Sequence, residues 1–139
     1  NIIPATPKGV IKILESQNIK LEGLNAVVVG RSNLVGKPTA HLLLQKNCTV
    51  TVCHSKTKDL AEYTKGADLI VSAVGKKGLI TKDMVKEGVI AIDVGITRES
   101  KKLYGDFGPN VKEKASFITP VPGGVGPVTI ACLIDNIIR

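Results

Sequence analysis

The sequence predicts an α/β fold in which a doubly wound, mainly parallel sheet is flanked by helices. Short runs of β-branched apolar residues alternate along the chain with stretches of helical periodicity, as expected of strands joined by helical crossovers. Two of these runs, residues 68–74 and 89–94, are almost continuously apolar, which is typical of strands buried on both faces. Aromatic residues make up only 3% of the 139 residues, which disfavours a sandwich with an aromatic core. A chain of this length is expected to form one domain.

The first half of the chain divides into helices and strands at recognisable start and stop residues. Pro7 suits the first turn of a helix over residues 7–17, in which Val10 and Leu14 fall on one face. Gly66 is expected to end a crossover helix. Between these points we expect a strand, a helix, a second strand and that crossover helix over residues 24–29, 37–46, 49–53 and 58–65.

The second half has weaker helical patterns. We expect the strand over residues 68–74 to be followed by a short helix over 81–87, closed by Gly88, and then by the strand over 89–94. Residues 95–110 have little periodicity and are expected to form a loop. A brief turn, a short strand and a C-terminal helix are expected over residues 112–114, 116–118 and 127–139.

The most informative motif is VVVGRSNLVGKP, residues 27–38. A β-branched run stops at Gly30, and Gly36 and Pro38 then open a helical pattern. A parallel strand that turns sharply into a helix leaves unpaired N–H groups and a positive dipole end at the turn, and both suit a pyrophosphate. The two glycines would permit the tight turn and a close approach of the backbone to a ligand or strand. An ordinary strand-to-helix turn is the alternative, because the three closely spaced glycines of the dinucleotide fingerprint are not present.

The end of the second expected strand, with the sequence CHSKT, bears on the choice of dinucleotide. In dinucleotide-binding folds an Asp or Glu at this point bonds the ribose hydroxyls of NAD. This chain has no acid there and instead places Ser55 and Lys56 near Arg31, which favours a 2′-phosphate and therefore NADP. Taken alone, Arg31 is equally compatible with a surface cation. His54 is interpreted as a hydrogen-bonded polar residue rather than as a catalyst.

A second unusual segment is TPVPGGVGP, residues 119–127. Its prolines and glycines fix a rigid path that is poor in side chains, and Pro127 then starts a helix whose amide end would point back at the crevice. A flat ring could lie directly against such a backbone. The alternative is a well-specified turn with no ligand.

Charge and cysteine usage narrow the class of partner. The net charge of +7 comes from scattered lysines and would attract anions such as a dinucleotide or a nucleic acid. Nucleic acid is disfavoured, because the chain lacks an RNP-like aromatic strand and zinc-ligand spacing.

The three cysteines show no CxxC spacing, so we expect reduced thiols, with Cys53 and Cys132 as small core residues. No apolar segment approaches the length of a membrane span, so a soluble protein is expected.

These motifs occur together in the order and spacing of the bifunctional methylenetetrahydrofolate dehydrogenase and methenyltetrahydrofolate cyclohydrolase family. The segments that resemble the family are PATPKG near the N-terminus, then GRSNLVGKP, CHSKT, SAVG, IDVGI, GD and TPVPGGVGP. The resemblance covers essentially the whole chain. After Gly105 and Asp106, however, the apolar strand start of the family is replaced by Phe107, Gly108 and Pro109.

The resemblance implies a Rossmann-like domain that binds NADP. Gly30, Arg31 and Ser32 would hold the pyrophosphate and ribose, Ser55 would hold the 2′-phosphate, and Ile96 would lie beside the nicotinamide. No residue of this chain is expected to be catalytic, and no metal is expected. The loop on the folate side of the cleft would be formed by Pro122, Gly123, Gly124, Val125, Gly126 and Pro127.

The resemblance also implies a reaction and a missing part. Family members carry an N-terminal lobe with a YxxxK segment for the cyclohydrolase step and a PxxDG segment that holds the pterin, and neither occurs here. We therefore expect the cofactor half of an enzyme that oxidises 5,10-methylenetetrahydrofolate to the methenyl form and hydrolyses that to 10-formyltetrahydrofolate. Alone, this half would bind NADP with little or no activity. A cytoplasmic homodimer that binds tetrahydrofolate one-carbon derivatives and serves purine biosynthesis is also implied. A stand-alone NADP-binding regulatory module without catalytic activity is the alternative.

Overall fold

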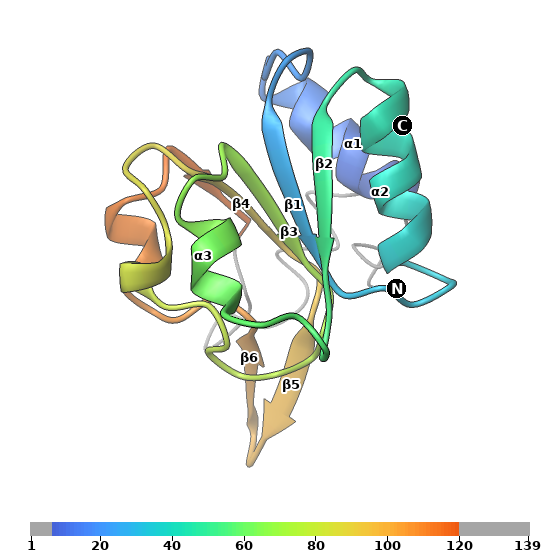
Figure 1. The fold of residues 1–139 in the computed structure, drawn as a ribbon. Helices are drawn as coiled ribbons and strands as arrows, with labels where there is room; N and C mark the ends of the chain where they lie inside the picture. Colours follow the sequence, from blue (N-terminus) through green and yellow to red (C-terminus); the bar gives the residue numbers. More distant parts are fainter. Residues whose placement is uncertain (1–6, 120–139) are drawn as a thin grey trace.

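The computed structural model describes residues 7–119 and places a five-stranded parallel sheet at the centre of the molecule (Figure 1). The strand order is β2-β1-β3-β4-β7, and every neighbouring pair is parallel. The doubly wound, mainly parallel sheet that the sequence predicts is confirmed. Its strands are β1 (Asn25–Val29), β2 (Thr49–Cys53), β3 (Leu69–Ser72), β4 (Ile90–Asp93) and β7 (Phe117–Ile118).

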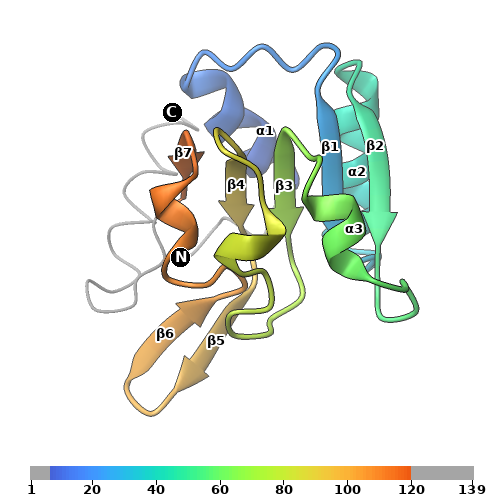
Figure 2. The same ribbon diagram turned by 60° about the vertical axis from the view of Figure 1, so that its left-hand side comes forward.

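Helices cover both faces of the sheet. The helices α1 (Pro7–Ser16) and α2 (Gly36–Gln45) lie on one face, and the short helix α3 (Leu60–Thr64) lies on the other (Figures 1 and 2). Each face has its own core. Along β1, Val28 packs into the core under α1 and α2, whereas Val27 and Val29 pack into the opposite one. Because alternate residues face opposite cores, this central strand is apolar on both faces from Ala26 to Val29.

The chain changes direction across the sheet at β1. The connection through α2 leads to β2 on one side of β1, and the connection through α3 leads to β3 on the other. The carboxyl ends of β1 and β3 therefore form the topological switch point, where ligands of open α/β sheets bind. The backbone is tightly joined here, because the Gly30 N–H donates to the Cys53 carbonyl at 2.8 Å and the Ala73 N–H donates to the Val29 carbonyl at 2.9 Å.

Two expected helices are shorter than the sequence predicts. The helix predicted over residues 58–65 begins only at Leu60, because Asp59 has a φ of +53° and so lies in the left-handed region. The helix predicted over residues 81–87 is wrong in kind: only a 3₁₀ turn, η2 (Lys82–Met84), is formed. The chain leaves the helical region at Val85, which has an extended backbone with φ −131° and ψ 157°.

The loop predicted over residues 95–110 is also wrong, because it contains an antiparallel hairpin. Strands β5 (Ile96–Glu99) and β6 (Lys102–Gly105) pair and project beyond the carboxyl ends of the central strands (Figure 2). Ser100 makes the tight turn with a φ of +58°. Sequence inspection missed this hairpin because its two-residue turn lacks the Asn-Gly or Asp-Gly pair that usually signals one.

The other elements expected from the sequence either match the structure or lie outside the described residues. A 3₁₀ turn, η3 (Val111–Glu113), and β7 lie close to the turn and strand predicted over 112–114 and 116–118. Cys53 is buried, as predicted. Within residues 7–119 no helix is both long enough and apolar enough to cross a membrane. The predicted C-terminal helix and Cys132 fall outside the described part of the chain.

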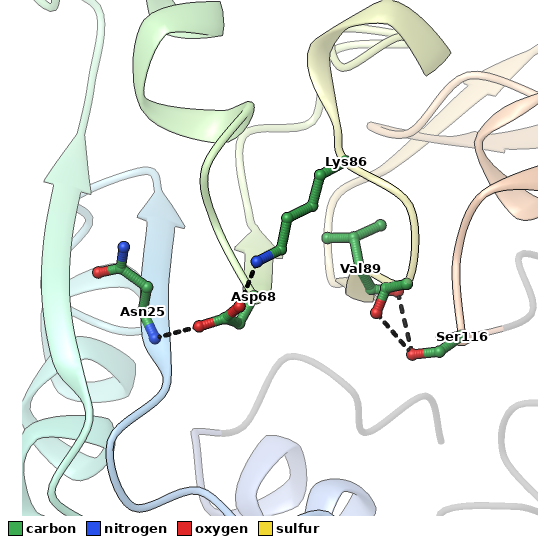
Figure 3. Close-up of polar contacts among 6 residues, drawn as sticks. Asn25, Asp68, Lys86, Val89 and Ser116 are labelled. Carbon is green, nitrogen blue, oxygen red and sulfur yellow. Dashed lines mark hydrogen bonds and ion pairs between the residues drawn. The ribbon is translucent and has the colours of Figure 1, made fainter.

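The amino-terminal edge of the sheet is held together by polar side chains (Figure 3). The Asp68 carboxylate accepts the Asn25 N–H at 2.9 Å and forms an ion pair with Lys86. Nearby, the Ser116 hydroxyl donates to the Gly88 carbonyl at 2.8 Å. The Lys86 ammonium, and after it the Asn25 N–H, lower the pKa of Asp68.

Candidate functional site

The glycines of the bend after β1 are required by close backbone approaches. Gly30 has a φ of +117°, and a Cβ at this position would lie 2.9 Å from the Ala73 carbonyl oxygen. A Cβ at Gly36 would collide with the carbonyl group of Gly30 and with the backbone of Arg31. Only glycine therefore fits both positions, and the start of α2 packs directly against the end of β1.

Ser32 accepts hydrogen bonds from the start of α2, whose N-cap residue is Val35. The Ser32 hydroxyl oxygen accepts the N–H groups of Val35 and Gly36 at 3.1 Å each, and its carbonyl accepts the Lys37 N–H at 2.9 Å. The first amides of α2 are thus satisfied within the chain. Earlier in the bend, the N–H groups of Arg31, Ser32, Asn33 and Leu34 have no hydrogen-bond partner among residues 7–119.

The end of β2 forms a compact turn that presents Ser55. His54 donates its N–H to the Thr57 hydroxyl at 2.8 Å and accepts the Lys56 N–H through its imidazole Nδ1 at 3.1 Å. His54 therefore stabilises the turn, in agreement with its interpretation as a hydrogen-bonded polar residue. Ser55 and Lys56 are exposed at its tip. Arg31 is exposed on the neighbouring bend, since β1 and β2 are paired along their whole length.

Ile96 lies at a different part of the same edge. It is the first residue of β5 and is half-buried. The backbone before it is fixed to β3, because the N–H groups of Val94 and Gly95 both donate to the Ser72 carbonyl, at 2.8 and 3.1 Å. The structure thus places Gly30, Arg31 and Ser32 after β1, Ser55 after β2 and Ile96 after β4, all at the carboxyl edge. The predicted loop of residues 122–127 lies outside the described chain.

Sequence reasoning missed two buried carboxylates at this edge. Asp106 is fully buried and follows the hairpin, and its carboxylate accepts four hydrogen bonds. The donors are the Ser72 hydroxyl at 2.7 Å and the N–H groups of Val74 at 2.8 Å, Gly75 at 3.0 Å and Lys76 at 2.8 Å. The sequence offered only the GD pair among the family-like segments, with nothing to indicate which backbone would surround the acid.

Asp93, at the end of β4, is the second buried acid and is 3% exposed. Its carboxylate accepts the N–H groups of Asp106 at 3.0 Å and Phe107 at 3.1 Å. Burial is the main cause that raises the pKa of Asp93 to about 7, and the nearby Asp106 carboxylate adds to it, against the lowering effect of the backbone N–H groups. The side chain therefore changes charge near neutral pH.

A cavity of about 630 Å³ opens beside these carboxylates, at the carboxyl ends of β4 and β7. Its lining is mostly apolar, with Tyr104 and Phe107 from the hairpin side, and it also includes Asp93, Lys112 and Thr119. The residues of the Gly30 bend and of the Ser55 turn are not among those that line it. The edge therefore offers two separate features, an amide-rich bend over β1 and β2 and an apolar cavity over β4 and β7.

Comparison with known proteins agrees with this arrangement. Residues 4–139 match the family described as tetrahydrofolate dehydrogenase/cyclohydrolase, NAD(P)-binding domain. The bifunctional protein FolD of Caldanaerobacter subterraneus subsp. tengcongensis is 61% identical over 135 residues, which are 96% of this chain and 48% of that protein. The chain thus spans about half the length of the curated relatives it matches.

Two solved structures show the same fold. The bifunctional FolD enzyme, a methylenetetrahydrofolate dehydrogenase/cyclohydrolase from Campylobacter jejuni, superposes with a TM-score of 0.83 at 55% identity, over 96% of this chain and 48% of that one. The Trypanosoma brucei enzyme, solved with NADP and an inhibitor, gives a TM-score of 0.80 at 37% identity with the same coverages. The family and the pyridine-dinucleotide cofactor expected from the sequence are confirmed. This chain belongs to the tetrahydrofolate dehydrogenase/cyclohydrolase family, of which it forms the NAD(P)-binding domain.

Proposed function

We propose that this chain is the NADP-binding half of an enzyme that oxidises 5,10-methylenetetrahydrofolate to the methenyl form and hydrolyses the product to 10-formyltetrahydrofolate. Support comes from the family match and from relatives about twice as long that are named bifunctional. The residues of this chain would bind and orient the cofactor. The acid and base for hydrolysis would come from a lobe that precedes it.

The observation that carries the proposal is the bend between Gly30 and Gly36. Its backbone N–H groups from Arg31 to Leu34 have no partner in the described chain, and they lie at the switch point of the sheet. Free amides in that position suit the diphosphate of a dinucleotide. Gly36 also allows the bend to close tightly, since a Cβ there would collide with the carbonyl group of Gly30.

NADP is favoured over NAD by the residues beside the bend. No acid lies between Cys53 and Lys58, so the usual carboxylate partner of a free ribose 2′-hydroxyl is missing. Ser55 is exposed on its turn and would donate to a 2′-phosphate, and Arg31 would add a charge-assisted hydrogen bond.

Bound NADP supplies hydride acceptance at its nicotinamide ring. The chain contributes orientation, because hydride transfer needs the ring and the one-carbon bridge of the folate held in contact. Ile96 would lie beside the ring, and the loop from Pro122 to Pro127 would line the folate side. No residue within residues 7–119 is assigned a proton-transfer role in this scheme.

The family resemblance supports three further features. We propose a homodimer, a cytoplasmic location and a role in supplying 10-formyltetrahydrofolate to purine biosynthesis. The alternative of a stand-alone regulatory module has no particular observation in its favour. Sedimentation of the complete polypeptide tests the dimer, and its mass tests the preceding lobe.

Calorimetric titration of the complete polypeptide with NADP and with NAD tests the cofactor assignment. We expect NADP to bind more tightly, and Ser55→Ala to weaken NADP by about tenfold, the loss of one charge-assisted hydrogen bond, while leaving NAD unchanged. Formation of NADPH from NADP and 5,10-methylenetetrahydrofolate then tests the reaction.

The control is Lys20→Gln, which removes an exposed cation from the connection between α1 and β1. Its NADP affinity should equal that of the unmodified protein. Equal affinities for NADP and NAD would overturn the 2′-phosphate assignment, and absence of binding for both would overturn the proposed function.

A further inference from the structure

We propose that Asp106 is a positioning residue for the nicotinamide end of the cofactor, because its buried carboxylate ties the turn after β3 to the base of the β5–β6 hairpin. The inference rests on the proposed function, since it concerns how the same edge holds NADP. Asp106 does not itself touch the cofactor in this scheme.

Four donors surround the Asp106 carboxylate. Three successive backbone N–H groups, those of residues 74–76, point at one or other oxygen of Asp106, together with the Ser72 hydroxyl. Successive amides that converge on an anion form a nest of the kind that binds phosphates elsewhere. Here a side chain of the protein fills the nest, so it is a structural joint and is not available to a ligand.

The surrounding sequence makes room for this carboxylate. A Cβ at Gly95 would collide with both oxygens of the Asp106 carboxylate, although the φ of Gly95 lies outside the left-handed region. Steric space, and not backbone conformation, therefore requires glycine at this position. Gly95 immediately precedes Ile96, so the joint also fixes the backbone from which Ile96 projects.

The backbone of Asp106 is itself held in place by hydrogen bonds. The Asp93 carboxylate accepts the Asp106 and Phe107 N–H groups, and the Asp106 carbonyl accepts the Ile80 N–H at 2.9 Å. The Gly105 carbonyl accepts the Gly78 N–H at 3.0 Å. The ends of β3, β4 and β6 thus meet at one residue.

The position of the Asp106 joint decides which end of the cofactor it affects. The turn of residues 74–76 begins next to Ala73, whose carbonyl oxygen lies against Gly30 at the start of the diphosphate bend. Asp106 itself lies beyond this turn, beside Gly95. The bend and the Ser55 turn, which would supply most of the binding energy for NADP, lie over β1 and β2 and do not contact Asp106. Loss of the hydrogen bonds to Asp106 should therefore change the position of the nicotinamide ring of bound NADP more than the position of its phosphates.

The experiment compares Asp106→Asn with the unmodified sequence in the complete polypeptide. Asn retains the shape but presents an NH₂ group to donors that require an acceptor. We expect the single-turnover rate of hydride transfer to fall by about tenfold to a hundredfold, as for a small misplacement of the reacting groups. The dissociation constant for NADP should change little. Amide exchange at residues 74–76 should become faster.

The matched control is Asp68→Asn, because Asp68 also accepts a backbone N–H but lies at the opposite edge of the sheet. It should leave the rate of hydride transfer unchanged. A second variant, Ser72→Ala, removes only one of the four donors and should give a smaller fall in rate with the same unchanged affinity. If Asp106→Asn does not fold, the hydride-transfer rate of Ser72→Ala tests the role of Asp106 in its place.

The outcomes separate this inference from the proposed function. If the unmodified protein binds NADP and transfers hydride, the proposed function holds whatever the variants do. An unchanged transfer rate in the variants overturns the role of Asp106. An equal loss of NADP affinity and rate also overturns it, since that result indicates general destabilisation of the site.

Discussion

The two edges of the sheet use aspartates in opposite ways. At the amino-terminal edge, Asp68 is about one-third exposed at 34% and pairs with the ammonium of Lys86 (Figure 3). At the carboxyl-terminal edge, Asp93 and Asp106 are buried and their carboxylates accept mainly backbone N–H groups. The environment lowers the pKa of Asp68 and raises that of Asp93.

This contrast indicates what each edge is for. An exposed ion pair has a small desolvation cost and contributes little to stability, because water screens the two charges. Buried carboxylates are costly to desolvate, and they are retained where many donors must be held in one arrangement. In this domain that arrangement is found at the edge where the cofactor is expected.

The largest expected effect concerns the charge of Asp93. Its pKa of about 7 lies above the ordinary value, so the folded state keeps a proton that the unfolded chain releases. The contribution to stability is fully present below about pH 4 and is lost as the pH rises through 7, and three pKa units correspond to about 4 kcal/mol. Urea denaturation at several pH values should show this loss in the unmodified protein.

The variant Asp93→Asn isolates this effect, since its side-chain amide does not ionise in this range of pH. The difference in the free energy of unfolding between the two proteins should shift in favour of the variant as the pH rises from 4 to 8. Parallel curves over that range of pH, an interval set by the roughly three-unit shift, would contradict the assignment.

The next effect concerns space at the carboxyl edge. Gly95→Ala places a methyl group against the Asp106 carboxylate, and we expect a loss of about 1–3 kcal/mol of stability from overpacking. Gly66→Ala is the matched control, because a Cβ there meets nothing within 4 Å. Chemical denaturation should show that Gly66→Ala leaves the free energy of unfolding unchanged or raises it slightly. Equal effects at both glycines would show that the carboxylate can move aside.

The smallest effect is expected at the amino edge. Asp68→Asn should cost no more than about 1 kcal/mol at neutral pH and less at high salt, because the ion pair is partly exposed. The sign of the pH dependence is opposite to that of Asp93: the contribution is present above about pH 4 and is lost as the pH falls below it. A double-mutant cycle with Lys86→Met isolates the pair. A larger loss would mean that the Asn25 hydrogen bond dominates.

Local patterns indicated much of the architecture. The apolar run from Val27 to Val29 and the glycine that ends it predict a buried strand and a bend, since both depend on neighbouring residues alone. The same holds for β2 and for α2. The hairpin after Gly95 was not foreseen, because Ser100 adopts a positive φ without the residues that usually announce such a turn.

What the sequence by itself determined is the alternation of strands and helices, the bend at Gly30 and Gly36, and the absence of an acid after β2. These depend on residues that are close together along the chain. Only the tertiary structure decided that Ser72, Gly95 and Asp106 form a single joint, with Asp93 behind it. Parallel pairing and burial create that joint, and no short segment of the sequence contains the donors and the acceptor together.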